Sequence, residues 1–312
     1  MKKANLFGSF FFPLLRHLGI LLAVLTLLFF IQRLTGDPVA VLAGRGATPE
    51  AMASVRSEMG LDQPLLTQYA VYLQKTMTLD FGDSTMTQQS ALDMVLDRFP
   101  ATLLLSLSAI VLAIGFGIPL GIYSAIHQDR FDGKLINLFA GIMQATPNFW
   151  LGLILLLIFS VQLHWFSSVA NLEDNLLRRL ALPAITLSAF YMARLIRLVR
   201  CGIIDEMAQP YVLTARAKGL TRRTVFQRHV LRNTLIPVVT FITLDLSLMI
   251  NGSVIVESMF SYSGIGDQMI GAIFHRDFPL VQATVFVIAA FVISINAMSR
   301  YLHQLVDPRV TA

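Results

Sequence analysis

The sequence predicts an all-α membrane protein with six transmembrane helices and a small helical cap outside the bilayer. Two observations come from composition: 55% of the 312 residues are hydrophobic and only 14% are charged, whereas a soluble domain carries about 25% charged residues. The third is that apolar residues form six runs, each close to the length of about 20 residues that crosses a bilayer. Most of the chain therefore faces lipid or other helices rather than water.

The six runs divide the chain into spans and loops. They cover residues 12–34, 100–124, 137–162, 181–200, 235–257 and 280–304. The first run follows Lys2 and Lys3, as in a secretory signal peptide, but it is too long for one and no clear cleavage site follows it. We therefore predict an uncleaved N-terminal anchor over residues 1–34.

The distribution of Lys and Arg predicts the orientation in the membrane. Segment 35–98 has four cations against eight acids, whereas segment 194–232 has nine cations against Asp205 and Glu206. Because cytoplasmic loops are enriched in Lys and Arg, segment 194–232 is predicted to be cytoplasmic. Both termini are then cytoplasmic and segment 35–98 is extracytoplasmic. Arg178 and Arg179 fall outside, against the rule.

Segment 35–98 is predicted to form the extracytoplasmic helical cap. About 60 residues bury little core by themselves, so we expect the cap to rest on the membrane helices. Its helix signals are a start at Thr48-Pro49-Glu50, an end at Gly60, a second start at Asp62-Gln63-Pro64, a break at Leu79-Asp80-Phe81-Gly82 and a third short helix over about 88–97.

A short basic helix is predicted over residues 210–219, between the fourth and fifth spans. Pro210 suits its first turn and Gly219 its end. A helix that lies on lipid has a wide face of bulky apolar residues, whereas this one is mostly small and basic after its first three side chains. Docking into a cleft of a protein partner is therefore favoured over binding to lipid headgroups.

A further basic helix is predicted to begin at Thr221 and to run to Pro237. The positive charge of this region follows from membrane topology. A nucleic-acid-binding protein would need a soluble basic face with aromatic residues, and we exclude that class.

Three polar residues of the fifth span are candidates for lining a translocation path: Asp245, Asn251 and Ser253. Carboxylates within a membrane are costly and often functional. Asp245 has no evident buried basic partner in the sequence. A hydrogen bond to a neighbouring helix, or a water-lined cavity without specific chemistry, would explain it equally well.

Helix-breaking residues recur in two spans. They are Gly115, Gly117, Pro119 and Gly121 in the second span, and Pro147 and Gly152 in the third. Close helix packing and bends in a moving pore are both consistent with them.

Several kinds of chemistry are excluded or disfavoured. No G-x-x-x-x-G-K-[ST] loop for nucleotides and no H-E-x-x-H metal motif occurs. Gly264-Ile265-Gly266-Asp267 matches the GxGD pattern of intramembrane aspartyl proteases, which need two carboxylates, but it falls after the fifth span and no Tyr-Asp partner lies in the preceding helix. Cys201 is the single cysteine, so no internal disulfide can form. His164, Met143, Met192 and Met249 lie in or near spans three to five and are candidates for a role in metal passage, but methionines in an apolar chain are mostly core or lipid-facing, which disfavours that role.

A series of motifs, nearly from end to end, resembles the peptide/nickel class of ABC importer permeases. The matching segments are Arg33-Leu34-Thr35-Gly36-Asp37-Pro38, Gly60-Leu61-Asp62-Gln63-Pro64, Asp80-Phe81-Gly82-Asp83-Ser84, Arg98-Phe99-Pro100-Ala101-Thr102, Pro147-Asn148-Phe149-Trp150, Thr214-Ala215-Arg216-Ala217-Lys218-Gly219, Arg228-His229-Val230-Leu231-Arg232-Asn233, Val256-Glu257-Ser258-Met259-Phe260, Gly264-Ile265-Gly266, Arg276-Asp277-Phe278-Pro279 and Asp307-Pro308-Arg309. Two departures are Ser263, where a proline is common, and the loop between the third and fourth spans, which lacks the usual Leu-Pro followed by glycines.

The resemblance implies a type I ABC importer architecture, with an anchor over 1–34, the cap over 35–98 and a five-helix permease core over 99–312. The protein would be a non-catalytic subunit without a cofactor in the bacterial inner membrane. Its implied partners are a second homologous permease, two ABC ATPase subunits, an extracytoplasmic solute-binding protein and membrane lipid. Helix 210–219 would be the coupling helix, and its contact residues would be Tyr211, Thr214, Ala215, Arg216, Ala217, Lys218 and Gly219.

The motifs look closest to nickel-type members, so nickel or a nickel chelate is the expected substrate and di- or oligopeptides are the alternative. Outside the family, an ion-coupled secondary carrier is the main rival, although only Asp245 offers the mid-membrane charge that it would need. A membrane receptor is a second rival and would work without an ATPase.

Overall fold

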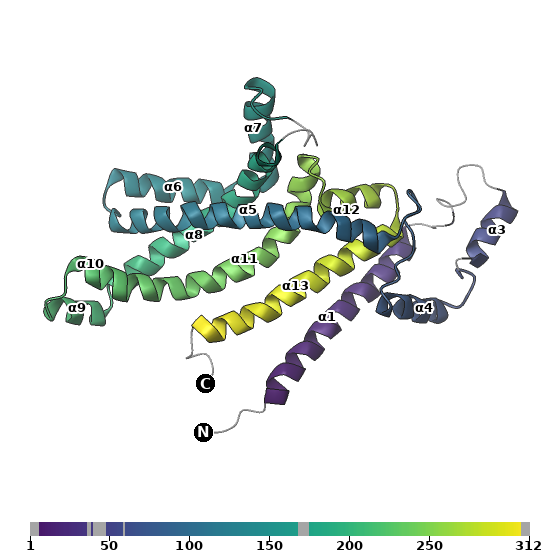
Figure 1. The fold of residues 1–312 in the computed structure, drawn as a ribbon, viewed down its shortest axis with the longest axis horizontal. Coiled ribbons are helices and arrows are strands. Elements are labelled where there is room, and N and C mark those ends of the chain that lie inside the picture. Colours follow the sequence, from purple (N-terminus) through teal and green to yellow (C-terminus); the bar gives the residue numbers. More distant parts are fainter. Residues whose placement is uncertain (1–5, 36–38, 40–47, 59, 168–174, 307–312) are drawn as a thin grey trace. The chain divides into compact units, whose positions relative to one another are not determined.

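The computed structural model describes residues 6–35, 39, 48–58, 60–167 and 175–306, which are mainly helical (Figure 1). The helices are α1 (Leu6–Thr35), α3 (Pro49–Glu58), α4 (Leu65–Met77), α5 (Ala91–Ile126), α6 (Phe131–Ala145), α7 (Asn148–Leu155), η1 (Leu156–Gln162), α8 (Leu176–Met207), α9 (Pro210–Ala217), α10 (Arg222–Val225), η2 (Phe226–Val230), α11 (Leu231–Met259), α12 (Ile265–Phe274) and α13 (Phe278–Val306). In this described part, β-pairing is limited to one isolated bridge between Asp83 and Ser90. The all-α prediction is confirmed.

The chain divides into two compact units. One is drawn from residues 1–100 and 268–293, and the other from 101–267 and 294–312. The sequence-based division at residues 34 and 98 stays a prediction.

Within the described ranges, four helical stretches are long and apolar enough to cross a membrane. They are Ala91–Ile126, Leu176–Met207, Arg222–Met259 and Phe278–Met298. The bent pair of α6 and α7–η1 is a fifth candidate. The sixth predicted span, the apolar run over 12–34 in α1, is not among these stretches, and only the shorter apolar helix Leu18–Leu34 is found there. The count of six spans therefore stays a prediction.

The third predicted span, 137–162, is not one straight helix. It consists of α6 and the α7–η1 segment, which meet at an angle of 105°. Proline disfavours the helical conformation of the residue before it, and Thr146, before Pro147, is extended with φ −82° and ψ 125°. At Pro147 the bend is the explanation observed, whereas at Gly152 close packing is, because an added Cβ would meet the side chains of Met259 and Thr186.

Two other helix boundaries differ from the prediction. The expected short helix over 88–97 is instead the first part of α5, which runs without a break from Ala91 to Ile126. Pro237 lies inside α11 rather than ending it. A helix among other helices tolerates an internal proline where neighbouring groups satisfy the freed carbonyl, so the signal of Pro237 overstated the second break.

In the first unit, α4 packs on α1 through polar and aromatic contacts. Thr26 and Tyr69 are hydrogen-bonded at 2.7 Å, and the Tyr72 hydroxyl donates to the Leu25 carbonyl at 3.2 Å. The ring of Phe29 lies against Tyr69 and beneath the Arg33 guanidinium, 3.5 Å from the ring centroid. These contacts supply α4 with a surface to bury, which a segment this small lacks alone.

The loop after α4 is fixed by Asp277, which precedes α13. The buried Asp277 carboxylate accepts hydrogen bonds from the Ser84 hydroxyl and from the backbone N–H of Thr85 at 3.2 Å and Leu280 at 3.4 Å. Two motifs that are far apart in the sequence, Asp80–Ser84 and Arg276–Pro279, are thereby joined.

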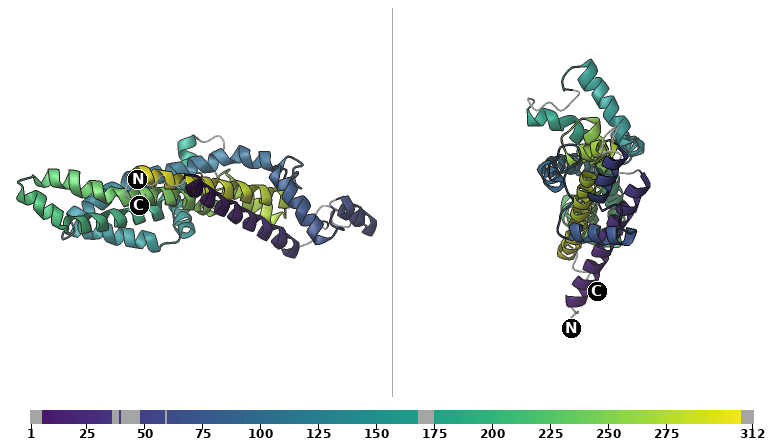
Figure 2. Two further views of the ribbon diagram at one scale, coloured as in Figure 1. Left: turned by 90° about the horizontal axis from the view of Figure 1, so that it is seen from below. Right: turned by 90° about the vertical axis from the view of Figure 1, so that its right-hand side faces the viewer.

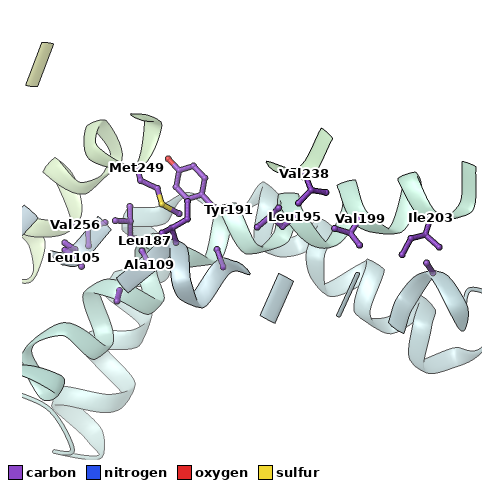
Figure 3. Packing of buried hydrophobic residues seen from close by; sticks show 14 of the residues in the cluster. Leu105, Ala109, Leu187, Tyr191, Leu195, Val199, Ile203, Val238, Met249 and Val256 are labelled. Atoms are coloured by element: carbon purple, nitrogen blue, oxygen red, sulfur yellow. The ribbon is translucent and has the colours of Figure 1, made fainter. Parts of the chain in front are cut away.

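The core of the second unit is a row of apolar side chains along α8, packed against α5 and α11 (Figure 3). Leu187, Tyr191, Leu195, Val199 and Ile203 recur every four residues along α8 and are each at most 5% exposed. This i, i+4 spacing places them on one face of the helix. The α8 helix is thus the central helix of this unit.

Close packing between α5 and α8 depends on two small residues of α5. A Cβ atom at Gly117 would lie 2.9 Å from Leu195 Cβ, and one at Gly121 would lie 2.8 Å from Val199 Cβ. A Cβ at Gly115 would meet nothing within 4 Å. Two of the three α5 glycines are therefore explained by packing, and Gly115 is not.

Candidate functional site

The predicted basic helix between the fourth and fifth spans is α9. Gln209 precedes it in an extended conformation and Pro210 occupies its first turn. Gly219, with φ +84°, ends the turn after it in the left-handed region that suits glycine. The α9–α10 segment lies at the same end of α8 and α11 in Figure 1 and in the left view of Figure 2.

One face of α9 is buried against the rest of the unit. Val212 is fully buried and Ala215 is 8% exposed, which fits their spacing of three residues on a helix. Tyr211 is half-buried. Two of the seven predicted contact residues, Tyr211 and Ala215, thus face the chain itself at least in part.

Tyr211 also ties α9 to two other helices by hydrogen bonds. Its hydroxyl donates to the Glu206 carboxylate, near the end of α8. The same oxygen accepts a hydrogen bond of 3.1 Å from Nδ2 of Asn233, in the first turn of α11. Burial raises the pKa of the Tyr211 phenol, and the hydrogen bond to Glu206 acts in the same direction. The phenol therefore stays protonated and able to donate.

The other predicted contact residues are exposed. Thr214, Arg216, Ala217, Lys218 and Gly219 are all open to solvent, as is Leu213 beside them. The nearby cations Arg222, Arg223, Arg228 and Arg232 are exposed as well. No Asp or Glu occurs in the sequence from 207 to 244, so this end of the molecule is basic and suits an acidic partner.

Asp245 has a basic partner, contrary to the reading of the sequence. Its Oδ1 lies 2.9 Å from Nη1 of Arg194, so the pair joins α11 to α8. Asp245 is 2% exposed, and the Arg194 guanidinium also lies over the Phe241 ring, 4.4 Å from its centroid. Arg194 was assigned to the cytoplasmic loop, but it lies inside α8. The presence of Arg194 within the fourth apolar run, 181–200, could have indicated a basic partner for Asp245.

The three candidate pathway residues have separate surroundings. Asp245 pairs with Arg194, whereas the Ser253 hydroxyl donates to the Glu257 carboxylate at 2.8 Å. Asn251 is exposed and donates to the Ser247 carbonyl at 3.5 Å. The structure does not bring the three side chains together, and their role in a pathway stays a prediction.

Glu257 is a buried carboxylate whose role the sequence did not suggest. It is fully buried and accepts the backbone N–H of Gly266 at 2.7 Å in addition to the Ser253 hydroxyl. Thr102 of α5 completes the turn by accepting the backbone N–H of Ile265 at 2.9 Å. Gly264–Asp267, which matched the aspartyl protease pattern, is therefore a turn and helix start held by Glu257.

Among the described residues, no group of three or more His, Cys, Asp or Glu side chains could hold a metal ion.

Models of two families match the chain. Residues 117–312 match the binding-protein-dependent transport system inner membrane component family, and residues 12–107 match the N-terminal family of the same system's membrane components.

Individual relatives extend the similarity over nearly the whole chain. A putative peptide transport system permease protein of Brucella abortus (strain 2308) is 36% identical over 297 residues, which are 93% of this chain and 94% of the relative. The glutathione transport system permease protein GsiC of Escherichia coli (strain K12) is 34% identical over 281 residues, covering 90% and 91%.

Solved structures share the fold. The inward-facing MetNI methionine ABC transporter matches 69% of this chain and 96% of its own, with a TM-score of 0.57 and 14% identity. An amino acid ABC transporter crystallised with histidines matches 68% and 94%, with a TM-score of 0.53 and 15% identity.

Proposed function

Because the chain belongs to the binding-protein-dependent transport system inner membrane component family, a family of ABC importer permeases, we propose that it forms half of a translocation path for peptides. Its own part is non-catalytic. Two ABC ATPase subunits supply the energy, a second related permease forms the other half, and an extracytoplasmic binding protein delivers the solute. Both termini lie in the cytoplasm of the bacterial cell, and the protein crosses the inner membrane several times.

The observation that carries the proposal is the exposed basic face of α9. The helix lies between two candidate spans, α8 and Arg222–Met259, and carries exposed Arg216 and Lys218 on a segment without acids. We assign this face to an acidic cleft of an ATPase subunit. The contact residues are Leu213, Thr214, Arg216, Ala217, Lys218 and Gly219, and Val212 and Ala215 support them from beneath.

The sequence motifs favoured nickel, but the substrate we propose is peptides. Relatives with 34–36% identity over at least 90% of the chain are named as peptide and glutathione permeases. None of these findings points to nickel. In this proposal the solute path is lined by Asn251 and by residues around Asp245. Ser253 contributes indirectly, through its hydrogen bond to Glu257.

The proposal is tested by reconstituting the permease with its partner permease, ATPases and binding protein in liposomes. We expect ATP-dependent uptake of a labelled dipeptide or tripeptide, with no comparable uptake of ⁶³Ni²⁺ supplied free or with histidine. The permease alone should accumulate nothing. Uptake that stops when the proton gradient collapses at constant ATP would instead identify an ion-coupled carrier.

The coupling face is tested by Arg216→Glu. Reversal of one charge at a basic interface is expected to weaken association with the ATPase roughly tenfold or more, measured by co-purification and by uptake. Arg130→Glu, an exposed cation in the turn between α5 and α6, is the matched control and should leave association near wild type. Equal effects of both changes would refute the assignment of this face.

A further inference from the structure

The Tyr211 hydroxyl is the point at which three helices meet. It belongs to α9, donates to Glu206 of α8 and accepts from Asn233 of α11. Glu206 lies one residue before the end of α8 at Met207, and Asn233 is the third residue of α11. One oxygen atom therefore holds α9 to the adjoining ends of two long helices.

These bonds differ in kind from the other contacts of α9. Val212 and Ala215 bury apolar surface, and such contacts are not directional. The Thr214 hydroxyl bonds to the Pro210 carbonyl within α9 itself. Across the described residues, the side-chain hydrogen bonds that link α9 to other helices are those of Tyr211. Because hydrogen bonds require both distance and angle, they set the orientation of α9 where apolar contact does not.

We propose that Tyr211 is a positioning residue that transmits movement of α9 to α8 and α11 during the transport cycle, through Glu206 and Asn233. This inference rests on the proposed function, since it needs an ATPase to move α9. It adds a second role within α9: the ring and hydroxyl of Tyr211 contact the helices of the permease, whereas the exposed residues beside Tyr211 meet the ATPase.

The geometry explains why both long helices would respond. An α-helix rises 1.5 Å per residue, so α8, with 32 residues, and α11, with 29 residues, carry a displacement at one end deep into the unit. The two helices also pack against each other along the buried row of α8. A shift of α9 that is passed to both ends reorients them as a pair.

The test compares Tyr211→Phe with wild type in the complete reconstituted importer. The variant removes one oxygen and keeps the ring, so the exposed face of α9 is unchanged. We expect normal co-purification of the ATPases and continued ATP hydrolysis. The ATP hydrolysed per peptide imported should rise roughly tenfold or more, the factor that corresponds to one hydrogen bond to a charged group.

Two variants of Glu206, which accepts the hydrogen bond of Tyr211, add a conservative substitution and a double-mutant cycle. Glu206→Gln keeps an acceptor oxygen for the Tyr211 hydroxyl and should stay near the wild-type ratio, whereas Glu206→Leu should raise it. Combining Glu206→Leu with Tyr211→Phe should add little, because both changes remove the same link. A general loss of stability would not distinguish Gln from Leu in this way.

Tyr123→Phe is the matched control. It removes another tyrosine-to-carboxylate hydrogen bond, 2.7 Å from the Tyr123 hydroxyl to Asp132, at the turn between α5 and α6. This change should leave the ATP-to-peptide ratio at its wild-type value.

Two kinds of failure are distinguishable. Wild-type protein that shows no ATPase association and no ATP-dependent uptake refutes the proposed function. A wild-type importer that works, together with an unchanged ratio in Tyr211→Phe, refutes the inference alone. Should Tyr211→Phe fail to assemble, the same ratio is measured for Glu206→Leu, and a wild-type value there refutes the inference as well.

Discussion

At the scale of single residues, the pair of Arg194 and Asp245 has the clearest energetic consequence. Asp245 is 2% exposed and the two charges lie 2.9 Å apart, so each neutralises the other in a region with little water. Among the residues that the structure describes, Oδ2 of Asp245 has no hydrogen-bond partner, so the neutralisation of this carboxylate depends on Arg194. Removal of one member leaves the other without compensation.

We therefore predict that Asp245→Leu lowers the free energy of unfolding by about 3 kcal/mol, near the low end for a buried pair because Arg194 is partly exposed. Arg194→Leu combined with Asp245→Leu should recover most of that loss. The measurement is a denaturant titration in detergent. Arg197→Leu, whose guanidinium bonds to Gln144 at an exposed site, is the control and should change stability by less than about 1 kcal/mol. A single Asp245→Leu variant as stable as wild type would contradict this account.

At the scale of elements, the contact of α5 with α8 depends on Gly121. An added Cβ would lie 2.8 Å from Val199 Cβ and 2.9 Å from the Ile196 carbonyl oxygen. The carbonyl belongs to the backbone, so the contact is relieved only if one helix moves.

We predict that Gly121→Ala destabilises the protein by about 1–3 kcal/mol, the usual cost of overpacking. Gly115→Ala lies in the same helix and its Cβ would meet nothing within 4 Å. That control should be neutral or stabilising by up to about 1 kcal/mol, because alanine favours helix over glycine. Thermal unfolding of both variants in one detergent is the measurement, and shifts in the same direction would contradict the packing argument.

At the scale of the whole molecule, topology is open to a direct test because Cys201 is the single cysteine of the chain. It is exposed and lies near the C-terminal end of α8, which the charge distribution assigns to the cytoplasm. We predict that a membrane-impermeant maleimide labels Cys201 in inside-out vesicles and not in intact spheroplasts. Cys201→Ser should abolish labelling in both. Labelling from the outside only would reverse the predicted orientation.

Features of the fold that depend on neighbouring residues could be predicted from the sequence, whereas features that depend on packing between distant helices could not. The bounds of α9 followed from Pro210 and Gly219, and the start of α4 followed from Pro64, because caps and prolines act on their own neighbours. The breaks expected near residue 97 and at Pro237 were wrong, because packing among helices overrides a local signal. The 105° bend at Pro147 was one of two open explanations.

The candidate site shows the same division. The exposed basic residues of α9 were identified from the sequence, since charge and helix period are local properties. The partners Glu206 and Asn233 of Tyr211, and Arg194 of Asp245, were not identified. Their bonds join residues between 5 and 51 positions apart, and no periodic pattern marks which side chains meet.

The sequence by itself determined the helical class, the family and the basic segment, because composition, apolar run length and ordered motifs are properties of the chain in one dimension. Only the tertiary structure decided which buried charges are paired, which glycines permit helix contact and which helices α9 is bonded to. The physical reason is that hydrogen bonds and close packing act over a few ångströms in space, and only folding brings distant residues within that range.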